Sequence, residues 1–513
     1  ARVSIIPVQP GVPLTGPPPG VRSEDSGQFT LSGLVPGRYR LMVSRDGYAG
    51  SGMSPGMPQA VQLISLSPGE KLKNVTLRLT PGAVISGRIL DETGEPVIGA
   101  MIHVLRQATE FGRRTFVPAT RGDQSNDLGE YRIHSLPPGK YYLSVQVNPG
   151  RSVPTASSPT EQQEGYVMTF YPNALSPAQA QLLEVRPGER LEGMDFAIHP
   201  VPVRTVTGVV KYARTGQPPH QAFVQLVQAD NGDGASRLRG FGGGVDAKGA
   251  FRIGGVMPGA YTLVARSSMS ARESVTGRLA VSVGEENVSG LELLVTPGGT
   301  IKGGVRVEKA DQPQPDAPDP LKNMRIFLRP EDPVLGPFGM MPPVPDENGG
   351  FELFGVHPGS YRVSPNLPPG FYLKRVKFGD QTSENNRIQV PDGFTTGTLE
   401  LLVSPNSATI GGTLLDKDQK PVSQGPLLVV PDFDKPEDLD TDRIVPGQSD
   451  QRGGFEIRGV PPGKYRVLGF RVLEPGRSRD PELIAQAAGR AEKVEVQEKD
   501  RKQVTVRAVE QEE

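Results

Sequence analysis

Short runs of alternating apolar and polar residues follow one another along the whole chain, and turn-forming residues separate them. Val75, Leu77 and Leu79 alternate with polar residues, and a new run over residues 84–90 begins just after Pro81 and Gly82. A period of two is typical of strands with one buried face. Because Gly and Pro between the runs favour tight turns, the pattern predicts an antiparallel all-β fold with short connections.

Helical patterns are rare in this chain. Residues 177–185 and 481–493 each begin with a proline and predict one or two helical turns between strands. In the second stretch, Leu483, Ile484 and Ala487 have helical spacing. The two stretches are interpreted as equivalent inserts.

One hairpin pattern occurs five times, and its first aromatic residue and its final Tyr are ten residues apart in every copy. Each copy reads Asp, a short gap, Gly, one residue, Phe or Tyr, an apolar strand, Pro-Gly, one residue and Tyr. We expect the Asp to cap a tight turn, and the Tyr to bury its ring and hold a loop through its hydroxyl. The copies start at Asp25, Asp127, Asp246, Asp346 and Asp450, and their repeated Gly and Tyr residues are Gly37, Tyr39, Gly139, Tyr141, Gly259, Tyr261, Gly359, Tyr361, Gly463 and Tyr465.

The copies recur every 100 to 120 residues, which is the size of one small β-sandwich. They predict five tandem modules, 1–81, 82–200, 201–297, 298–405 and 406–513. The joints between modules are short and contain proline, which restricts how one sandwich swings against the next, so we expect an elongated rod. Residues 1–5 are similar to the second strand of later modules, so module 1 is predicted to lack its opening strand. Either the chain is a fragment of a longer one, or a neighbouring chain supplies that strand.

Composition narrows the classes of partner. Lys and Arg number 56 against 57 Asp and Glu, so no net field attracts nucleic acid. The 0 Cys residues exclude disulfides and thiolate metal sites, and they favour an exported protein. The sequence has no apolar run of the roughly 18 residues that predict a transmembrane segment.

The candidate chemistry is sparse. The five His residues are scattered singly, without the spacing of a metal or catalytic site. The recurring Asp residues supply one carboxylate per turn, whereas Ca²⁺ takes six to eight oxygen ligands. We therefore predict no catalytic residue, no metal and no cofactor.

Two aromatic pairs and one loop are candidate contacts. The pairs Phe170-Tyr171 and Phe371-Tyr372 predict either exposed platforms for a glycan or packing at an edge strand. The loop 334–344 carries an apolar group that suits a subunit contact better than a sugar site. That group consists of Phe338, Met340 and Met341.

The run Gly87-Arg88-Ile89-Leu90-Asp91, the turn Gly94-Glu95-Pro96-Val97 and the hairpin that follows resemble the carboxypeptidase regulatory-like domain. This domain is a transthyretin-like or prealbumin-like β-sandwich, close to the Cna-B type. The resemblance extends over nearly the whole chain, and modules 2 and 5 match best. It implies a tandem array of Ig-like antiparallel β-sandwiches in a bacterial secreted or cell-surface protein, without catalytic residues.

The expected function is that of a non-catalytic extracellular structural protein, a modular rod that self-associates into a surface filament or stalk. The alternative is a carbohydrate- or protein-binding adhesin, or an accessory module of a secreted or outer-membrane protein. Its partner would be a polysaccharide or a cell-surface protein.

Overall fold

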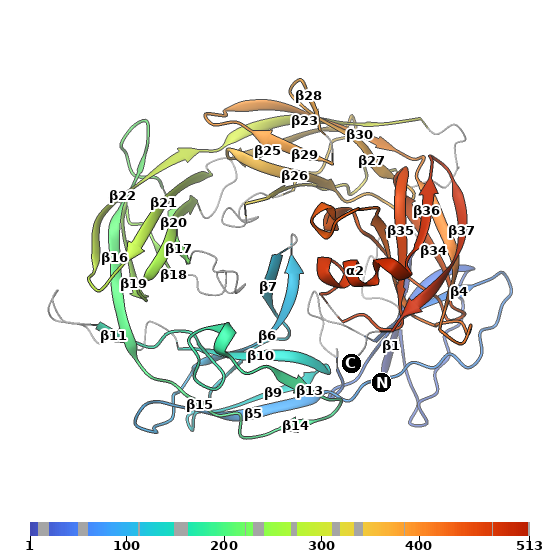
Figure 1. Ribbon diagram of the computed structural model, residues 1–513, viewed down its shortest axis with the longest axis horizontal. Coiled ribbons are helices and arrows are strands. Elements are labelled where there is room, and N and C mark those ends of the chain that lie inside the picture. The colour runs from blue at the N-terminus through green and yellow to red at the C-terminus, as the bar shows by residue number, and fades with distance from the viewer. Residues whose placement is uncertain are drawn as a thin grey trace. The chain divides into compact units, whose positions relative to one another are not determined.

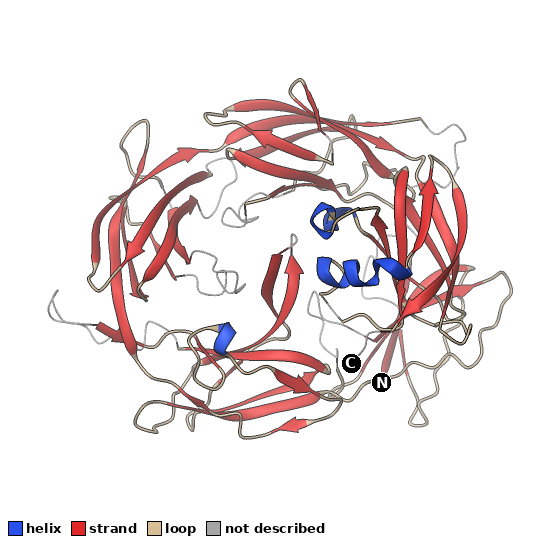
Figure 2. Ribbon diagram, viewed as in Figure 1, coloured by secondary structure: helices blue, strands red, loops and turns tan. Residues whose placement is uncertain are grey.

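A computed structural model of the chain describes residues 1–8, 20–49, 60–110, 113–147, 163–220, 222–228, 241–267, 274–309, 319–332, 342–383, 385–474 and 476–510. The chain divides into two compact units. Unit 1 is Ala1–Gln146, Thr169–Ile198 and Asn406–Glu513, and unit 2 is Val147–Met168 and His199–Pro405. Strands form nearly all of the regular structure in both units, so the predicted all-β fold is confirmed (Figures 1 and 2).

Unit 2 contains three sheets. Strands β11 (Gln163–Gly165), β16 (Val201–Tyr212), β22 (Val288–Pro297), β21 (Val275–Val283), β20 (Gly259–Ser267), β17 (Ala222–Gln228) and β18 (Phe241–Gly244) lie in that order, and β19 (Ala250–Val256) pairs with β16. The second sheet has the order β25 (Gly350–Val356), β23 (Gly299–Val307), β30 (Thr396–Ser404), β27 (Tyr372–Phe378) and β28 (Gln381–Ser383). The third is β24 (Ile326–Pro330), β26 (Gly359–Pro365) and β29 (Arg387–Val390).

The strands of unit 1 fall into the segments 1–81, 82–200 and 406–513, except that residues 147–168 and 199–200 belong to unit 2. Segment 1–81 forms one sheet, β2 (Gly20–Arg22), β1 (Arg2–Pro7), β3 (Gly37–Ser44) and β4 (Ala60–Leu66). Segment 82–200 forms the order β12 (Thr169–Phe170), β10 (Gly139–Gln146), β6 (Met101–Glu110) and β7 (Arg113–Pro118), with β13 (Leu183–Val185) on β10 and β8 (Asp123–Gln124) on β6. Its other sheet is β14 (Arg190–Leu191), β5 (Ala83–Leu90) and β15 (Phe196–Ala197), with β9 (Glu130–Leu136) on β5.

Segment 406–513 completes unit 1. Its strands have the order β33 (Val445–Gln448), β32 (Pro426–Pro431), β35 (Gly463–Phe470), β37 (Arg501–Val509), β31 (Ala408–Leu415) and β34 (Gly454–Val460), and β36 (Glu492–Val496) pairs with β35. Helix α2 (Pro481–Ala487) buries Leu483, Ile484 and Ala487 against Phe433 and Phe470. The short 3-10 helices are η3 (Pro436–Asp438), η4 (Thr441–Arg443) and η5 (Ala488–Arg490) here, and η1 (Pro177–Gln179) in segment 82–200.

Both predicted helical inserts are confirmed, as α2 with η5 in one stretch and as the single turn η1 in the other. Helix α2 and η5 end at Arg490, and β36 begins at Glu492. In the other insert only η1 is helical, because β13 takes residues 183–185 into a pairing with β10. In both places, hydrogen bonding to a neighbouring strand replaces the continuing helix.

Four strands that we call opening strands share one pairing pattern. They are β5, β16, β23 and β31, and each pairs antiparallel with the first strand of the repeated hairpin, which is β9, β19, β25 or β34. On its other side each pairs in parallel with a closing strand. The closing strands are β14 with β15, β22, β30 and β37.

Segment 1–81 departs from this pattern. The alternation of Val75, Leu77 and Leu79 predicted a closing strand, and that prediction is wrong, since residues 71–80 carry no strand. Among the described residues, no opening strand lies beside them to supply hydrogen bonds. Their apolar side chains still pack against the core of Val3, Ile5, Tyr39, Leu41, Val43 and Ile64.

The repeated Tyr side chains do what the pattern predicts. All five rings are buried, with at most 5% of the residue exposed. Each hydroxyl donates to the carbonyl oxygen of the residue four positions earlier, which ties the strand to the turn before it. These bonds are Tyr39 to Val35 (2.7 Å), Tyr141 to Pro137 (2.9 Å), Tyr261 to Met257 (2.8 Å), Tyr361 to His357 (2.8 Å) and Tyr465 to Pro461 (2.9 Å).

The turn-capping prediction holds for three of the five Asp residues. Asp246, Asp346 and Asp450 each accept two backbone N–H bonds within their own turn, at 2.8 to 2.9 Å. In segment 82–200 the acceptor is Asn126, which bonds the N–H groups of Leu128 and Glu130. The capping residue therefore lies one position before Asp127, where it was predicted. Asp25 is displaced in the same way, because Glu24 begins the turn that closes on Gln28.

Removing one of the tyrosine hydroxyls tests this tie. Tyr141→Phe leaves the buried Pro137 carbonyl without its 2.9 Å donor. We therefore expect the free energy of unfolding to fall by about 1–2 kcal/mol. Hydrogen exchange of the β9 and β10 amides measures it. Tyr142→Phe is the matched control, because no hydrogen bond joins the Tyr142 hydroxyl to the part of the chain described here. Equal exchange in both variants would contradict the role of the tie.

His357 lies in unit 2, in the turn between β25 and β26, and its carbonyl oxygen accepts the bond from Tyr361. Its Nε2 is 2.9 Å from Ser274 Oγ, while its buried Nδ1 has no hydrogen-bond partner among the described residues. Burial lowers the pKa of His357 from 6.5 to about 4. The imidazole is therefore neutral in the folded chain at neutral pH.

Acid should therefore destabilise unit 2. Between pH 6.5 and 4 the unfolded chain binds a proton at His357 and the folded chain does not, so stability falls across that window and levels off below it. The expected loss is about 3 kcal/mol. Urea midpoints at pH 7.5 and 4.5 measure this loss, and His357→Leu should abolish the part due to this group. The exposed His134→Leu control should keep it, and an unchanged pH dependence in His357→Leu would refute the assignment.

Candidate functional site

The predicted aromatic contacts are mostly internal. Phe170 in β12 is fully buried, and Tyr372 at the start of β27 is 6% exposed. Tyr171 is half-buried and meets the ring of Phe196 edge-on at 5.6 Å. Phe371 packs against the core of its segment. This burial favours the packing role and not the role of an exposed glycan platform, most clearly for Phe170 and Tyr372. Phe338, Met340 and Met341 lie outside the described residues.

A charged cleft of about 310 Å³ lies within unit 1, between the hairpin β6–β7, the turn before β10 and the loop before α2. Tyr141 and Tyr142 contribute to its wall. Its charged side chains are Arg106, Arg114, Lys140, Glu474, Arg477 and Asp480.

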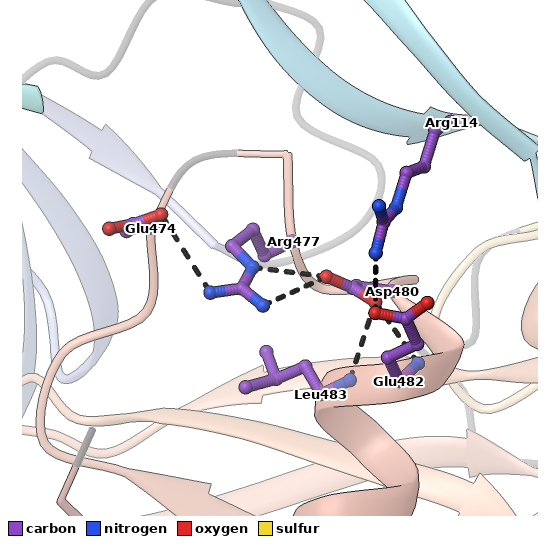
Figure 3. Close-up of polar contacts among 6 residues, drawn as sticks. All are labelled: Arg114, Glu474, Arg477, Asp480, Glu482 and Leu483. Carbon is purple, nitrogen blue, oxygen red and sulfur yellow. Dashed lines mark hydrogen bonds and ion pairs between the residues drawn. The ribbon is translucent and has the colours of Figure 1, made fainter. Parts of the chain in front are cut away.

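Most of these charged side chains are paired, as Figure 3 shows, and Arg477 pairs with Glu474 and Asp480 within the loop before α2. Arg477 donates two bonds to Asp480 Oδ2, both at 3.0 Å. Asp480 Oδ1 accepts from the N–H groups of Glu482 and Leu483 and so caps α2. Arg114 pairs with Glu482. Paired in this way, these carboxylates hold the loop before α2 and join α2 to β7.

Arg106 differs from its neighbours in the cleft. Its Nη1 is buried without a hydrogen-bond partner among the described residues. Burial raises the pKa of the adjacent Tyr141 hydroxyl to about 12, and the charge of Arg106 opposes that rise. The cleft thus offers a guanidinium for an acidic group, but no pair of groups poised for acid–base chemistry. Within the described residues, no group of three or more acidic or His side chains can hold a metal ion.

The most specific arrangement in unit 1 lies at the outer edge of β4. The Gln424 side chain accepts from Leu63 N at 2.7 Å and donates to Leu63 O at 2.9 Å. Gln451 does the same with Ser65 N and O, both at 3.2 Å. Residues two apart in a strand turn their backbone groups to the same edge. The two carboxamides, here called the glutamine clamp, therefore bond this edge as a partner strand would.

Charged side chains extend the clamp on both sides. Arg38 Nη1 donates to Glu456 O at 3.0 Å, and Arg452 pairs with Glu70. The pKa of Glu70 is lowered, chiefly by the backbone N–H of Ser67 and further by Arg452. Clamp partners lie 361 and 386 residues apart in the chain. The contact therefore joins the first segment to the last.

The backbone at Gln424 supports a dedicated role for its side chain. Gln424 has φ of +62°, and the matching residue of segment 82–200 is Gly99, with φ of +72°. The match follows from the neighbouring bonds, since Ser125 Oγ accepts from Ala100 N as Ser449 Oγ accepts from Gly425 N. A non-glycine residue in this conformation costs about 1 kcal/mol or more, and the clamp offsets that cost.

Sequence reasoning did not find the clamp. Glutamine carries no motif, and the two residues are remote from β4 in the chain. The available signal was the substitution of Gln424 for a glycine of the repeated turn.

Comparison with known proteins supports the domain type for one part of the chain. Residues 84–163 match the family model of the carboxypeptidase regulatory-like domain. No curated protein matches the chain in sequence. No described helix is long and apolar enough to cross a membrane.

Three solved structures illustrate the likeness to known proteins, and all three are distant in sequence. The Bacillus anthracis TIE protein is 12% identical, over 86% of this chain and 76% of that one, with a TM-score of 0.16. A streptococcal ancillary pilin is 10% identical, over 60% and 99%, with a TM-score of 0.19. The shaft pilin SpaA from Lactobacillus rhamnosus GG is 13% identical, over 43% and 98%, with a TM-score of 0.17.

Removing the clamp should expose the edge of β4. Gln424→Gly keeps the left-handed backbone without strain and deletes the carboxamide, and Gln451→Ala deletes the second one. We expect the amides of Leu63 and Ser65 to exchange about tenfold faster in the respective variants, because each loses an acceptor worth about 1 kcal/mol. Gln503→Ala on β37 is the control. Unchanged exchange in the clamp variants would show that the clamp does not hold β4.

Proposed function

We propose that the chain is a non-catalytic structural protein, which acts at the cell surface or outside the cell and joins its parts, and its copies, through strand edges. The observation that carries this proposal is the glutamine clamp, which reads backbone N–H and C=O groups of β4. Contacts of this kind recognise a protein strand and not a small substrate.

The clamp also explains how copies would join. Its two halves, the edge of β4 and the surface of Gln424 and Gln451, are different surfaces that every copy carries. Contacts between unlike surfaces propagate from copy to copy unless a ring closes. An exchange of the contact between two chains would therefore lead to a filament.

The proposed location, at the cell surface or outside the cell, is supported by the composition. A chain with 0 Cys has no thiol to oxidise outside the cytoplasm. The carboxypeptidase regulatory-like match of residues 84–163 agrees with a modular accessory role.

A binding module is the second candidate, and the cleft beside Arg106 favours it. A buried guanidinium nitrogen without a partner among the described residues suits the carboxylate of an acidic sugar or peptide. Such a module would act as a monomer that carries its ligand in this cleft.

Light scattering over a concentration series, followed by negative-stain electron microscopy, tests the first candidate. We expect assemblies that grow with protein concentration. In Gln424→Gly combined with Gln451→Ala, the concentration at which assembly begins should be at least tenfold higher. The Gln503→Ala chain should assemble like the parent. A chain that stays monomeric at every concentration would contradict assembly and leave the binding module as the function to test.

A further inference from the structure

Segments 201–297 and 298–405 of unit 2 have separate hydrophobic cores. The buried side chains of one core run from Val206 to Val295, and those of the other run from Ile301 to Val403. The two cores share no residue among those described. Because a compact segment with its own core is stable by itself, each segment can stay folded while the contact between them changes.

The joint between these two segments is held at Gly298. Its N–H donates to the carbonyl oxygen of Ser274 at 2.9 Å, and a Cβ atom on it would lie 2.6 Å from the backbone of Gly355 at the end of β25. The joint at Gly82 in unit 1 is built in the same way, since its N–H donates to the carbonyl oxygen of Gly47 at 3.0 Å. Each joint thus ties the start of one segment to a loop of the segment before it.

His357 adds a side-chain contact to the joint at Gly298. Its Nε2 lies 2.9 Å from Oγ of Ser274, the residue whose carbonyl oxygen holds Gly298. The other four hairpins have an apolar residue at this position, four residues before the repeated Tyr, and these residues are Val35, Pro137, Met257 and Pro461. An apolar side chain therefore suits the turn, and the turn alone does not call for a histidine.

The His357 ring has no place for a second proton in this joint. The residue is 9% exposed, and its Nδ1 has no hydrogen-bond partner among the described residues. An imidazolium donates from both ring nitrogens. A protonated His357 would therefore bury its charge together with an unpaired N–H, which is costly.

The charged side chains nearest to this turn do not favour an imidazolium either. Arg278 of β21 pairs with Asp332, which follows β24, at 2.8 Å. The charge of Asp332 also acts on Arg266 of β20. Two positive charges and one negative charge thus lie on this side of the joint, and burial is the cause that lowers the pKa of His357.

We propose that His357 is an acid-sensitive lock between the two segments of unit 2. The neutral ring holds Ser274, and its protonation opens the joint at Gly298 while both segments stay folded. The closed joint excludes the proton that the open joint binds, so a falling pH shifts the population toward the open joint.

The direction and the size of this shift follow from the two states of the ring. In the open joint, His357 has the ordinary pKa of 6.5, and in the closed joint its pKa is about 4. The ratio of open to closed joints therefore rises as the pH falls from 6.5 to 4 and levels off below. The full rise is about 300-fold.

This inference goes beyond the proposed function, because it concerns a joint inside unit 2 and needs neither the glutamine clamp nor assembly. The joint at Gly82 has Pro137 in place of the histidine. We therefore expect it to stay closed in acid, which makes it a control within the same molecule.

Hydrogen exchange at the Gly298 amide measures the opening in the full chain. After correction for the intrinsic pH dependence of exchange, its protection should be at least tenfold lower at pH 4.5 than at pH 7.5. The Gly82 amide should keep its protection. At pH 4.5 the Gly298 amide should still exchange at least tenfold faster than the amides of β20 and β26, because those exchange only when a segment unfolds.

Variants assign the opening to the lock. His357→Met copies Met257, the residue at the same place in segment 201–297, and should remove the acid response. Ser274→Ala removes the hydroxyl that contacts the ring, and it should lower the protection of Gly298 about fivefold at pH 7.5. His220→Leu, at an exposed position of unit 2, should respond to acid like the parent chain.

Three results would overturn the proposal. The first is equal protection of Gly298 at the two pH values in the parent chain. The second is an acid response that persists in His357→Met, since other groups would then cause it. The third is exchange of Gly298 at the same rate as the amides of β20 and β26 at pH 4.5, since the opening would then be unfolding of unit 2.

Discussion

The opening strand is the element on which each complete segment depends. It lies between a hairpin strand and a closing strand, and it provides backbone hydrogen bonds to both. Its glycine admits the hairpin aromatic ring, as at Gly303 and Phe351, and its apolar residues fill the core beneath. Where no such strand is described, as in segment 1–81, the same apolar sequence forms no closing strand and stays half-exposed. One strand thus decides whether its two neighbours become strands at all.

The tyrosine tie acts on the opposite sheet and is independent of the opening strand. Tyr39 makes its bond to Val35 although its segment has no described opening strand. The ring brings apolar burial, and the hydroxyl satisfies a carbonyl that the turn leaves unpaired. The turn geometry is therefore local, and the five copies keep it despite their different surroundings.

Local features were accessible from the sequence and partner choice was not. The tyrosine tie and the all-β fold follow from spacing and alternation, which act within one hairpin. The cap at Asn126 was misplaced at Asp127 because adjacent polar residues suit the same turn. The strand predicted at residues 75–79 failed because alternation reports a buried face, whereas a strand also needs a hydrogen-bonding neighbour. The glutamine clamp depends on residues 361 positions apart, which no local pattern connects. The sequence did not decide whether Phe170 and Tyr372 lie at the surface or in the core, because a pair of aromatic residues suits both places.

The parallel pairing of opening and closing strands also governs how a segment responds to force. In segment 298–405, β23 and β30 lie side by side with eight residues of each in register, from Thr300 opposite Thr396 to Val307 opposite Val403. Tension applied at the start of β23 and at the end of β30 pulls these two strands past each other along their length. All the hydrogen bonds between them then resist together, instead of opening one after another from an end. Segments 201–297 and 406–513 pair their opening and closing strands in the same parallel way, so they too are built to bear tension along the chain.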